Sequence, residues 1–154
     1  MDLTAPSERD EGAEVTTTPS KAVPRPTPET QPFWDGCAAG ELRLQRCSSC
    51  DAHYFPPRPF CPTCLSDQVT WETASGRGTL HTYVINHRAA PGFEAPYAIA
   101  VVQLDEGPRM MSNIVGIENT PENLELDMAL EVTFEPRGDM MLPVFQPAST
   151  GGGQ

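Results

Sequence analysis

Apolar and polar residues alternate with a period of two at 42–46, and several further segments beyond it have strand-type composition, so the pattern predicts β-strands. Three short segments of this kind precede residue 76, and five further segments follow it. The first group is 42–46, 52–55 and 69–72, and the second is 79–86, 97–104, 110–115, 130–134 and 142–145. A change of character at Gly76-Arg77-Gly78 separates the two groups and suggests a boundary between structural units.

One short helix is expected ahead of the strands, over residues 31–38. Phe33, Trp34 and Cys37 recur at helical spacing, Thr30 precedes them as an N-cap, and Gly40 is a suitable stop. A helix this short is not stable alone, so its aromatic pair must pack on something. Two interpretations stay open: packing on the protein's own β-structure, or packing that also docks a partner subunit.

Four cysteines form the strongest chemical signal in the sequence. Cys47-Ser48-Ser49-Cys50 and Cys61-Pro62-Thr63-Cys64 are two Cys-x-x-Cys pairs separated by ten residues. Each pair places two thiolates on one tight turn, and two facing turns supply four sulfurs to one tetrahedral ion. The spacing predicts a structural zinc site with no open coordination position, so the metal itself does not specify a reaction.

The order of the elements predicts a mainly β fold with an N-terminal helix, a rubredoxin-like zinc ribbon and a C-terminal barrel. Five strands with a short helical turn at 120–124 after the third match the OB fold. We therefore expect a disordered tail over 1–29, the helix and ribbon over 30–75, the OB fold over 76–147, and a second disordered tail over 148–154. The first tail is predicted from its many prolines and its scarcity of large apolar residues.

Charge and composition narrow the possible functions. The formal net charge is -11, which disfavours general binding to nucleic-acid phosphates. No apolar stretch is long enough to span a membrane, and no secretion signal is recognised, so a cytoplasmic location is expected. The same reasoning favours a metal site over disulfides for the paired cysteines.

The remaining reactive residues form no catalytic arrangement. His53 lies near the cysteine pairs but is not needed as a ligand, and His81 and His87 sit on the first barrel strand without a nucleophile beside them. Cys37 occupies an apolar helical position and is interpreted as a buried side chain. The sequence therefore predicts a binding module with no catalytic residues of its own.

Several segments together resemble a bacterial and archaeal family of acyl-CoA-associated proteins. They are Phe33-Trp34, Gly40-Glu41-Leu42, the paired cysteines with their Pro-rich link, Gly76–Leu80, Pro91-Gly92-Phe93, Pro96-Tyr97, the segment from Val101 to Gly107, and Ser112–Gly116. The resemblance covers about residues 30–147. It implies a rubredoxin-like zinc ribbon joined to an OB fold, the same architecture that the strand pattern predicts.

The resemblance also implies a role. Members of this family accompany thiolases and thiolase-like aldolases that shorten steroid side chains, and some are fused to a hydratase domain. By resemblance we expect an accessory subunit in an α₂β₂ complex, close to the partner's acyl-CoA entrance. The expected partner contacts are Phe33, Trp34, His87, Arg88, Pro91, Gly92 and Phe93, and the expected contacts to CoA phosphates are Arg58 and Arg77. One alternative is a nucleic-acid-binding module, since zinc ribbons and OB folds both serve that purpose, and another is a free-standing acyl-CoA-binding protein.

Overall fold

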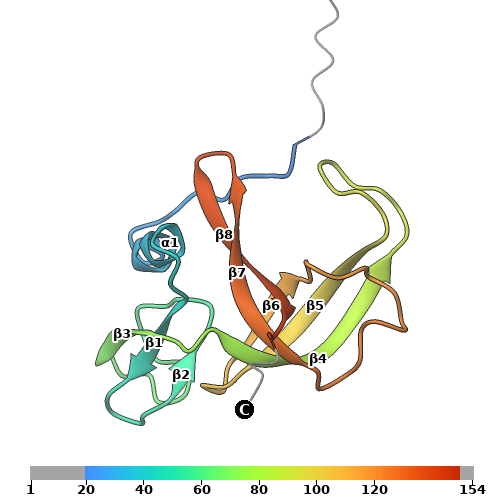
Figure 1. The fold of residues 1–154 in the computed structure, drawn as a ribbon. Helices are drawn as coiled ribbons and strands as arrows, with labels where there is room; N and C mark the ends of the chain where they lie inside the picture. The colour runs from blue at the N-terminus through green and yellow to red at the C-terminus, as the bar shows by residue number, and fades with distance from the viewer. Residues whose placement is uncertain (1–19, 150–154) are drawn as a thin grey trace, which may run out of the picture.

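The computed structural model describes residues 20–149, and within that range it contains one helix and eight strands in two sheets (Figure 1). The elements are α1 (Gln31–Ala38), β1 (Arg43–Cys47), β2 (His53–Tyr54), β3 (Val69–Thr73), β4 (Arg77–Asn86), β5 (Tyr97–Leu104), β6 (Arg109–Asn113), β7 (Ala129–Arg137) and β8 (Met140–Pro147). The predicted mainly β fold with an N-terminal helix is confirmed.

The smaller sheet has the order β2-β1-β3, and both of its pairings are antiparallel. Its central strand β1 buries Leu44 and also the polar residue Gln45. The Gln45 side chain is satisfied, because its Oε1 accepts a hydrogen bond of 2.6 Å from the backbone N–H of Arg58. This bond fixes the Pro-rich link between the two cysteine pairs against the sheet.

The larger sheet has the order β6-β5-β4-β7-β8 and curls into a barrel. Its two edges meet where Ile114 forms a parallel bridge with Phe145, and the Val115 N–H donates to the Phe145 carbonyl at 2.8 Å. A closed ladder leaves no free edge in a small sheet. This order and this closure are those of an OB fold, as the sequence predicts.

The helix packs on both sheets rather than on the ribbon alone. Phe33 and Cys37 of α1 belong to one continuous core that includes Leu44 of the small sheet and Leu80 and Phe145 of the barrel. Thr30 precedes the helix as predicted, but its side chain makes no capping hydrogen bond. Its Oγ1 instead accepts from the Thr27 N–H, because residues 27–30 form a turn of their own.

The predicted helical turn at 120–124 is a single hydrogen-bonded turn. The N–H groups of Asn123 and Leu124 both donate to the Thr120 carbonyl at 3.1 Å. This turn places Leu124, which is almost fully buried, under the barrel. It thereby closes the end of the core between β6 and β7.

Residues 20–26, which we call the N-terminal strap, lie in extended form beside the turn of the β7–β8 hairpin (blue in Figure 1). Lys21 forms an ion pair with Glu135 at 3.0 Å, and Val23 lies against Gly138. The expectation of a tail reaching residue 29 did not anticipate these contacts. The remaining parts of the two predicted tails, residues 1–19 and 150–154, lie outside the described residues.

Candidate functional site

The two Cys-x-x-Cys turns have the same local geometry. In the first, the Asp51 N–H donates to the Cys47 carbonyl at 2.8 Å, and in the second, the Leu65 N–H donates to the Cys61 carbonyl at 2.9 Å. Asp51 and Leu65 both have positive φ angles, 66° and 62°. Non-glycine residues seldom adopt this conformation, so its occurrence after both cysteine pairs reflects the reversal that each turn requires.

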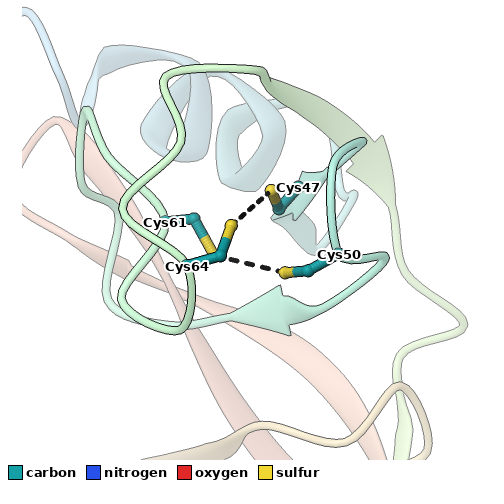
Figure 2. A group of neighbouring side chains, drawn as sticks. All are labelled: Cys47, Cys50, Cys61 and Cys64. Atoms are coloured by element: carbon teal, nitrogen blue, oxygen red, sulfur yellow. Dashed lines mark hydrogen bonds between the residues drawn. The ribbon is translucent and has the colours of Figure 1, made fainter.

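The four sulfurs converge between the two turns (Figure 2). Cys47 and Cys64 have their sulfurs 3.6 Å apart, as do Cys50 and Cys61, and all four sulfurs lie within 4.8 Å of one another. Zinc–sulfur bonds of about 2.3 Å at tetrahedral angles require sulfurs roughly 3.8 Å apart. The cluster therefore fits a zinc ion, and these four residues form a structural zinc site.

The surroundings of the cluster separate the four thiols into two pairs: the pKa is lowered at Cys47 and Cys61 and raised at Cys50 and Cys64, whose side chains hydrogen-bond to the other cysteines. Burial opposes ionisation of Cys61, but hydrogen bonds from the backbone of Cys64 and Thr63 and from the side chains of Cys50 and Cys64 together lower the pKa of Cys61 to about 6. The pKa of Cys47 is also lowered, for the same combination of burial and backbone donors. Deprotonated sulfur is the form that binds zinc, so the backbone donors favour the binding form at Cys47 and Cys61.

The other reactive residues stand apart from the metal centre, as the sequence predicts. His53 Nε2 lies 3.0 Å from Glu72 Oε2, so its ring is engaged on β3 rather than at the sulfurs. Cys37 is buried in the helix, and burial raises the pKa of its thiol to about 11. His81 and His87 are exposed, and His87 lies just beyond the end of β4.

A second feature, not predicted from the sequence, is a cavity of about 530 Å³ between α1, the Pro-rich link and the barrel. We call it the apolar groove and define it by Phe33, Trp34, Phe55, Phe93, Ile99 and Met111. Phe33 forms its inner wall and packs on Phe55 with ring centroids 5.4 Å apart. Met111 is 71% exposed and Ile99 is 38% exposed, so apolar surface of the barrel faces the groove unshielded.

The loop after β4 forms one wall of this groove. Residues 90–93 make a tight turn in which the Phe93 N–H donates to the Ala90 carbonyl at 2.8 Å, with Gly92 at a φ of 76°. The Phe93 ring stacks on Tyr97 with centroids 4.8 Å apart. A signal for this groove was present in the sequence: β5 carries apolar residues on its outward face as well as its inward face.

Only some of the residues expected to contact a partner or CoA phosphates line the apolar groove. Trp34 and Phe93 both line the apolar groove, whereas Phe33 is 3% exposed and packs mainly within the chain. The remaining expected partner contacts, His87, Arg88, Pro91 and Gly92, are exposed on the loop beside the groove. Arg58 and Arg77 are both exposed, but neither lines the groove, and they lie on different units, the Pro-rich link and the start of β4.

The fold and the sulfur cluster define a class of protein: a rubredoxin-like zinc ribbon followed by an OB barrel. Family models agree with both parts. Residues 34–70 match "ChsH2, rubredoxin-like zinc ribbon domain", and residues 71–135 match "ChsH2, C-terminal OB-fold domain". The chain belongs to this zinc-ribbon and OB-fold family, also called DUF35.

Several relatives bear names that describe complexes or enzymes. A probable enoyl-CoA hydratase alpha subunit of Thermomonospora curvata is 37% identical over 84% of this chain and 41% of its own length. A DUF35 domain-containing scaffold protein of Methanothermobacter thermautotrophicus is 34% identical over 60% of this chain and 71% of its own. The benzoylsuccinyl-CoA thiolase subunit BbsA of Thauera aromatica is 27% identical over 60% of this chain and 62% of its own.

A solved structure extends the comparison to the whole fold. A chain of the "Ltp2-ChsH2(DUF35) aldolase" has a TM-score of 0.72 and 32% identity, and the match covers 81% of this chain and 98% of that chain. The present chain spans only about two fifths of the hydratase alpha subunit named above. Among the residues described, no helix has the length and apolar character needed to cross a membrane.

Proposed function

We propose that this chain is a non-catalytic accessory subunit of a thiolase-superfamily acyl-CoA enzyme, either a retro-aldolase of the steroid side-chain type or a thiolase. The observation that carries the proposal is the match to a chain of the Ltp2-ChsH2(DUF35) aldolase, of which 98% is covered. The name of the thiolase subunit BbsA supports the wider class of partner.

The geometry of the described residues supports a role in binding rather than in chemistry. The four metal-binding cysteines leave zinc no open position, Cys37 is sealed in the core, and His53 is held by Glu72. A zinc ion closed by four protein ligands stabilises a fold and does not activate water. The reacting groups are therefore expected on the partner.

The exposed loop beside the apolar groove is the proposed docking surface. His87, Arg88 and Pro91 project from it without being needed for the core, and Trp34 lies at the groove nearby. A partner seated there would shield apolar surface that the isolated chain leaves open. Within the same proposal, the complex is an α₂β₂ assembly in the cytoplasm, and Arg58 and Arg77 contact the phosphates of the partner's acyl-CoA.

Co-expression with the thiolase-like protein encoded nearest in the genome tests the proposal. The two proteins should elute as one complex on size exclusion, and the partner should lose carbon–carbon bond cleavage or formation when this chain is withheld. Arg88→Glu should weaken the complex, because it reverses a charge at the proposed surface. Arg109→Glu, an exposed reversal on β6 at a residue that does not line the groove, is the matched control.

Separate elution of the two proteins, with a partner fully active alone, would refute the accessory role. Salt-sensitive binding of single-stranded oligonucleotides at micromolar protein would instead favour the nucleic-acid alternative. The net charge of -11 makes us expect no such binding.

A further inference from the structure

The apolar groove has the dimensions of a small-molecule site. Ligand pockets in proteins commonly enclose about 300–1,000 Å³ and are lined mainly by apolar and aromatic side chains with a few polar groups. The groove encloses about 530 Å³, and aromatic rings from α1, the Pro-rich link and the β4–β5 loop surround it. The groove therefore has the volume and the lining to hold the apolar part of one drug-sized molecule.

Arg137 is the one charged side chain among the described residues that line this mainly apolar space. Arg137, at the end of β7, is only 15% exposed, and its guanidinium lies 5.8 Å from the centre of the Phe93 ring. It donates from Nη2 to Glu135 Oε1 at 2.9 Å, and its Nε is buried with no hydrogen-bond partner. A guanidinium carries five N–H donors, so Arg137 retains donors that an acceptor at the groove could satisfy.

The charge around Arg137 is not balanced. Lys21 of the N-terminal strap pairs with the same oxygen of Glu135 at 3.0 Å and lies over the Phe93 ring at 4.4 Å. Two cations therefore share one carboxylate, and among the described residues neither forms an ion pair with a second. Burial disfavours ionisation of Glu135, but its hydrogen bonds from Arg137 and Lys21 lower its pKa, so it is ionised at neutral pH. One positive charge remains without a partner at this end of the groove.

An apolar cavity with unpaired positive charge at one end is complementary to an amphipathic anion. We propose that the apolar groove binds an amphipathic organic carboxylate, with its apolar body against Trp34 and Met111 and its carboxylate at Arg137. This binding is a property of the chain by itself and does not depend on the accessory role proposed above. The residues involved differ from Arg58 and Arg77, the expected contacts to CoA phosphates.

The two tryptophans of the chain permit a direct measurement. Trp34 lines the groove, whereas Trp71 lies on β3 of the ribbon and does not. In the zinc-loaded chain carrying Trp71→Phe, emission therefore reports from Trp34 alone. Titration with decanoate, with cholate and with neutral 1-decanol, each below its micellar concentration, compares a flexible anion, a rigid ring-containing anion and an uncharged analogue of the first.

We expect a saturable change in Trp34 emission with at least one carboxylate and markedly weaker binding of 1-decanol. Arg137→Gln should weaken carboxylate binding at least about tenfold, the effect of one charge-assisted hydrogen bond, while 1-decanol binding stays unchanged. Met111→Asp, at a side chain 71% exposed, should weaken binding of every probe without disturbing the core. Arg109→Gln is the matched control and should leave the titrations unchanged.

The inference is overturned if no probe gives a saturable change in a chain with full zinc content, or if decanol binds as tightly as decanoate. Equal carboxylate binding by Arg137→Gln and its parent would also overturn it. A chain that joins the thiolase-like partner but takes no probe would refute the ligand site and leave the accessory role standing. A chain that binds a carboxylate but forms no complex with the partner would support the ligand site and refute the accessory role.

Discussion

At the scale of single residues, the environment of each cysteine separates the metal ligands from the buried Cys37. Cys47 and Cys61 receive backbone donors that lower the pKa of each thiol, whereas Cys37 is enclosed by apolar side chains. The Cys-x-x-Cys spacing was sufficient to predict this division from the sequence, because two residues between ligands is a local constraint of one turn. The exposure of individual aromatic residues was not predictable in the same way, since it depends on contacts between distant strands.

Cys47→Ser is expected to remove zinc and to leave the ribbon unfolded. The ribbon has only a small buried cluster of its own, formed by Cys47, Tyr54 and Cys61. Structural zinc supplies roughly 10–16 kcal/mol of apparent binding free energy to small metal-dependent folds, so such a cluster cannot replace it. Metal analysis and soluble yield measure the effect. Cys37→Ala is the matched control: it should keep full zinc, and a soluble, zinc-replete Cys47→Ser would contradict the prediction.

Cys37 should resist alkylation in the folded protein. A pKa of about 11 leaves on the order of a thousandth of the thiol ionised at pH 8, and a side chain 1% exposed offers the reagent no access. Mass spectrometry after iodoacetamide treatment should show Cys37 labelled only when denaturant is added. Rapid labelling of the native, zinc-loaded chain would show that α1 opens from the core.

At the scale of elements, the positions of the strands could be predicted from short segments of strand-type composition, but what covers their outer faces could not. The predicted segments 79–86 and 97–104 correspond closely to β4 and β5, because inward residues such as Leu80 and Val102 are needed for the barrel core. The apolar groove was missed because it forms only when α1, the Pro-rich link and β6 come together. The N-terminal strap was missed because its attachment rests on a few ion-pair and cation–π contacts with no periodic pattern.

Glu135→Gln should loosen the N-terminal strap at neutral pH. The lowered pKa of Glu135 means that its ion pairs are fully present above the ordinary carboxyl value of 4.5 and are lost only as pH falls below it. A partly exposed pair contributes up to about 1 kcal/mol, so trypsin should cleave after Lys21 roughly two- to fivefold faster at pH 7.5. Glu122→Gln, at an exposed carboxylate outside this cluster, should leave the cleavage rate unchanged. Equal rates in all three chains would show that Glu135 does not hold the strap.

At the scale of the whole molecule, the zinc ribbon and the OB barrel share one hydrophobic core, although two separate family models match them. One buried cluster includes Phe33 of α1, Leu42 and Leu44 of the zinc ribbon, and Leu130 and Phe145 of the barrel. The zinc ion thus stabilises a sheet that itself forms part of the barrel's packing surface. The sequence boundary at Gly76 marks a change of sheet, while the core continues across it.

The ribbon and the barrel should therefore unfold together, and removal of zinc should destabilise both. Trp71 reports on the ribbon in a Trp34→Phe chain, and Trp34 reports on the helix and groove in a Trp71→Phe chain. Because both tryptophans pack against the same core, the two urea transitions should coincide, and chelation of zinc should shift both to lower urea. Far-ultraviolet circular dichroism of each variant provides the control for altered secondary structure. A Trp34 transition that keeps its midpoint after chelation, while the Trp71 signal is already lost, would show that the packing of α1 on the barrel does not depend on the zinc ribbon.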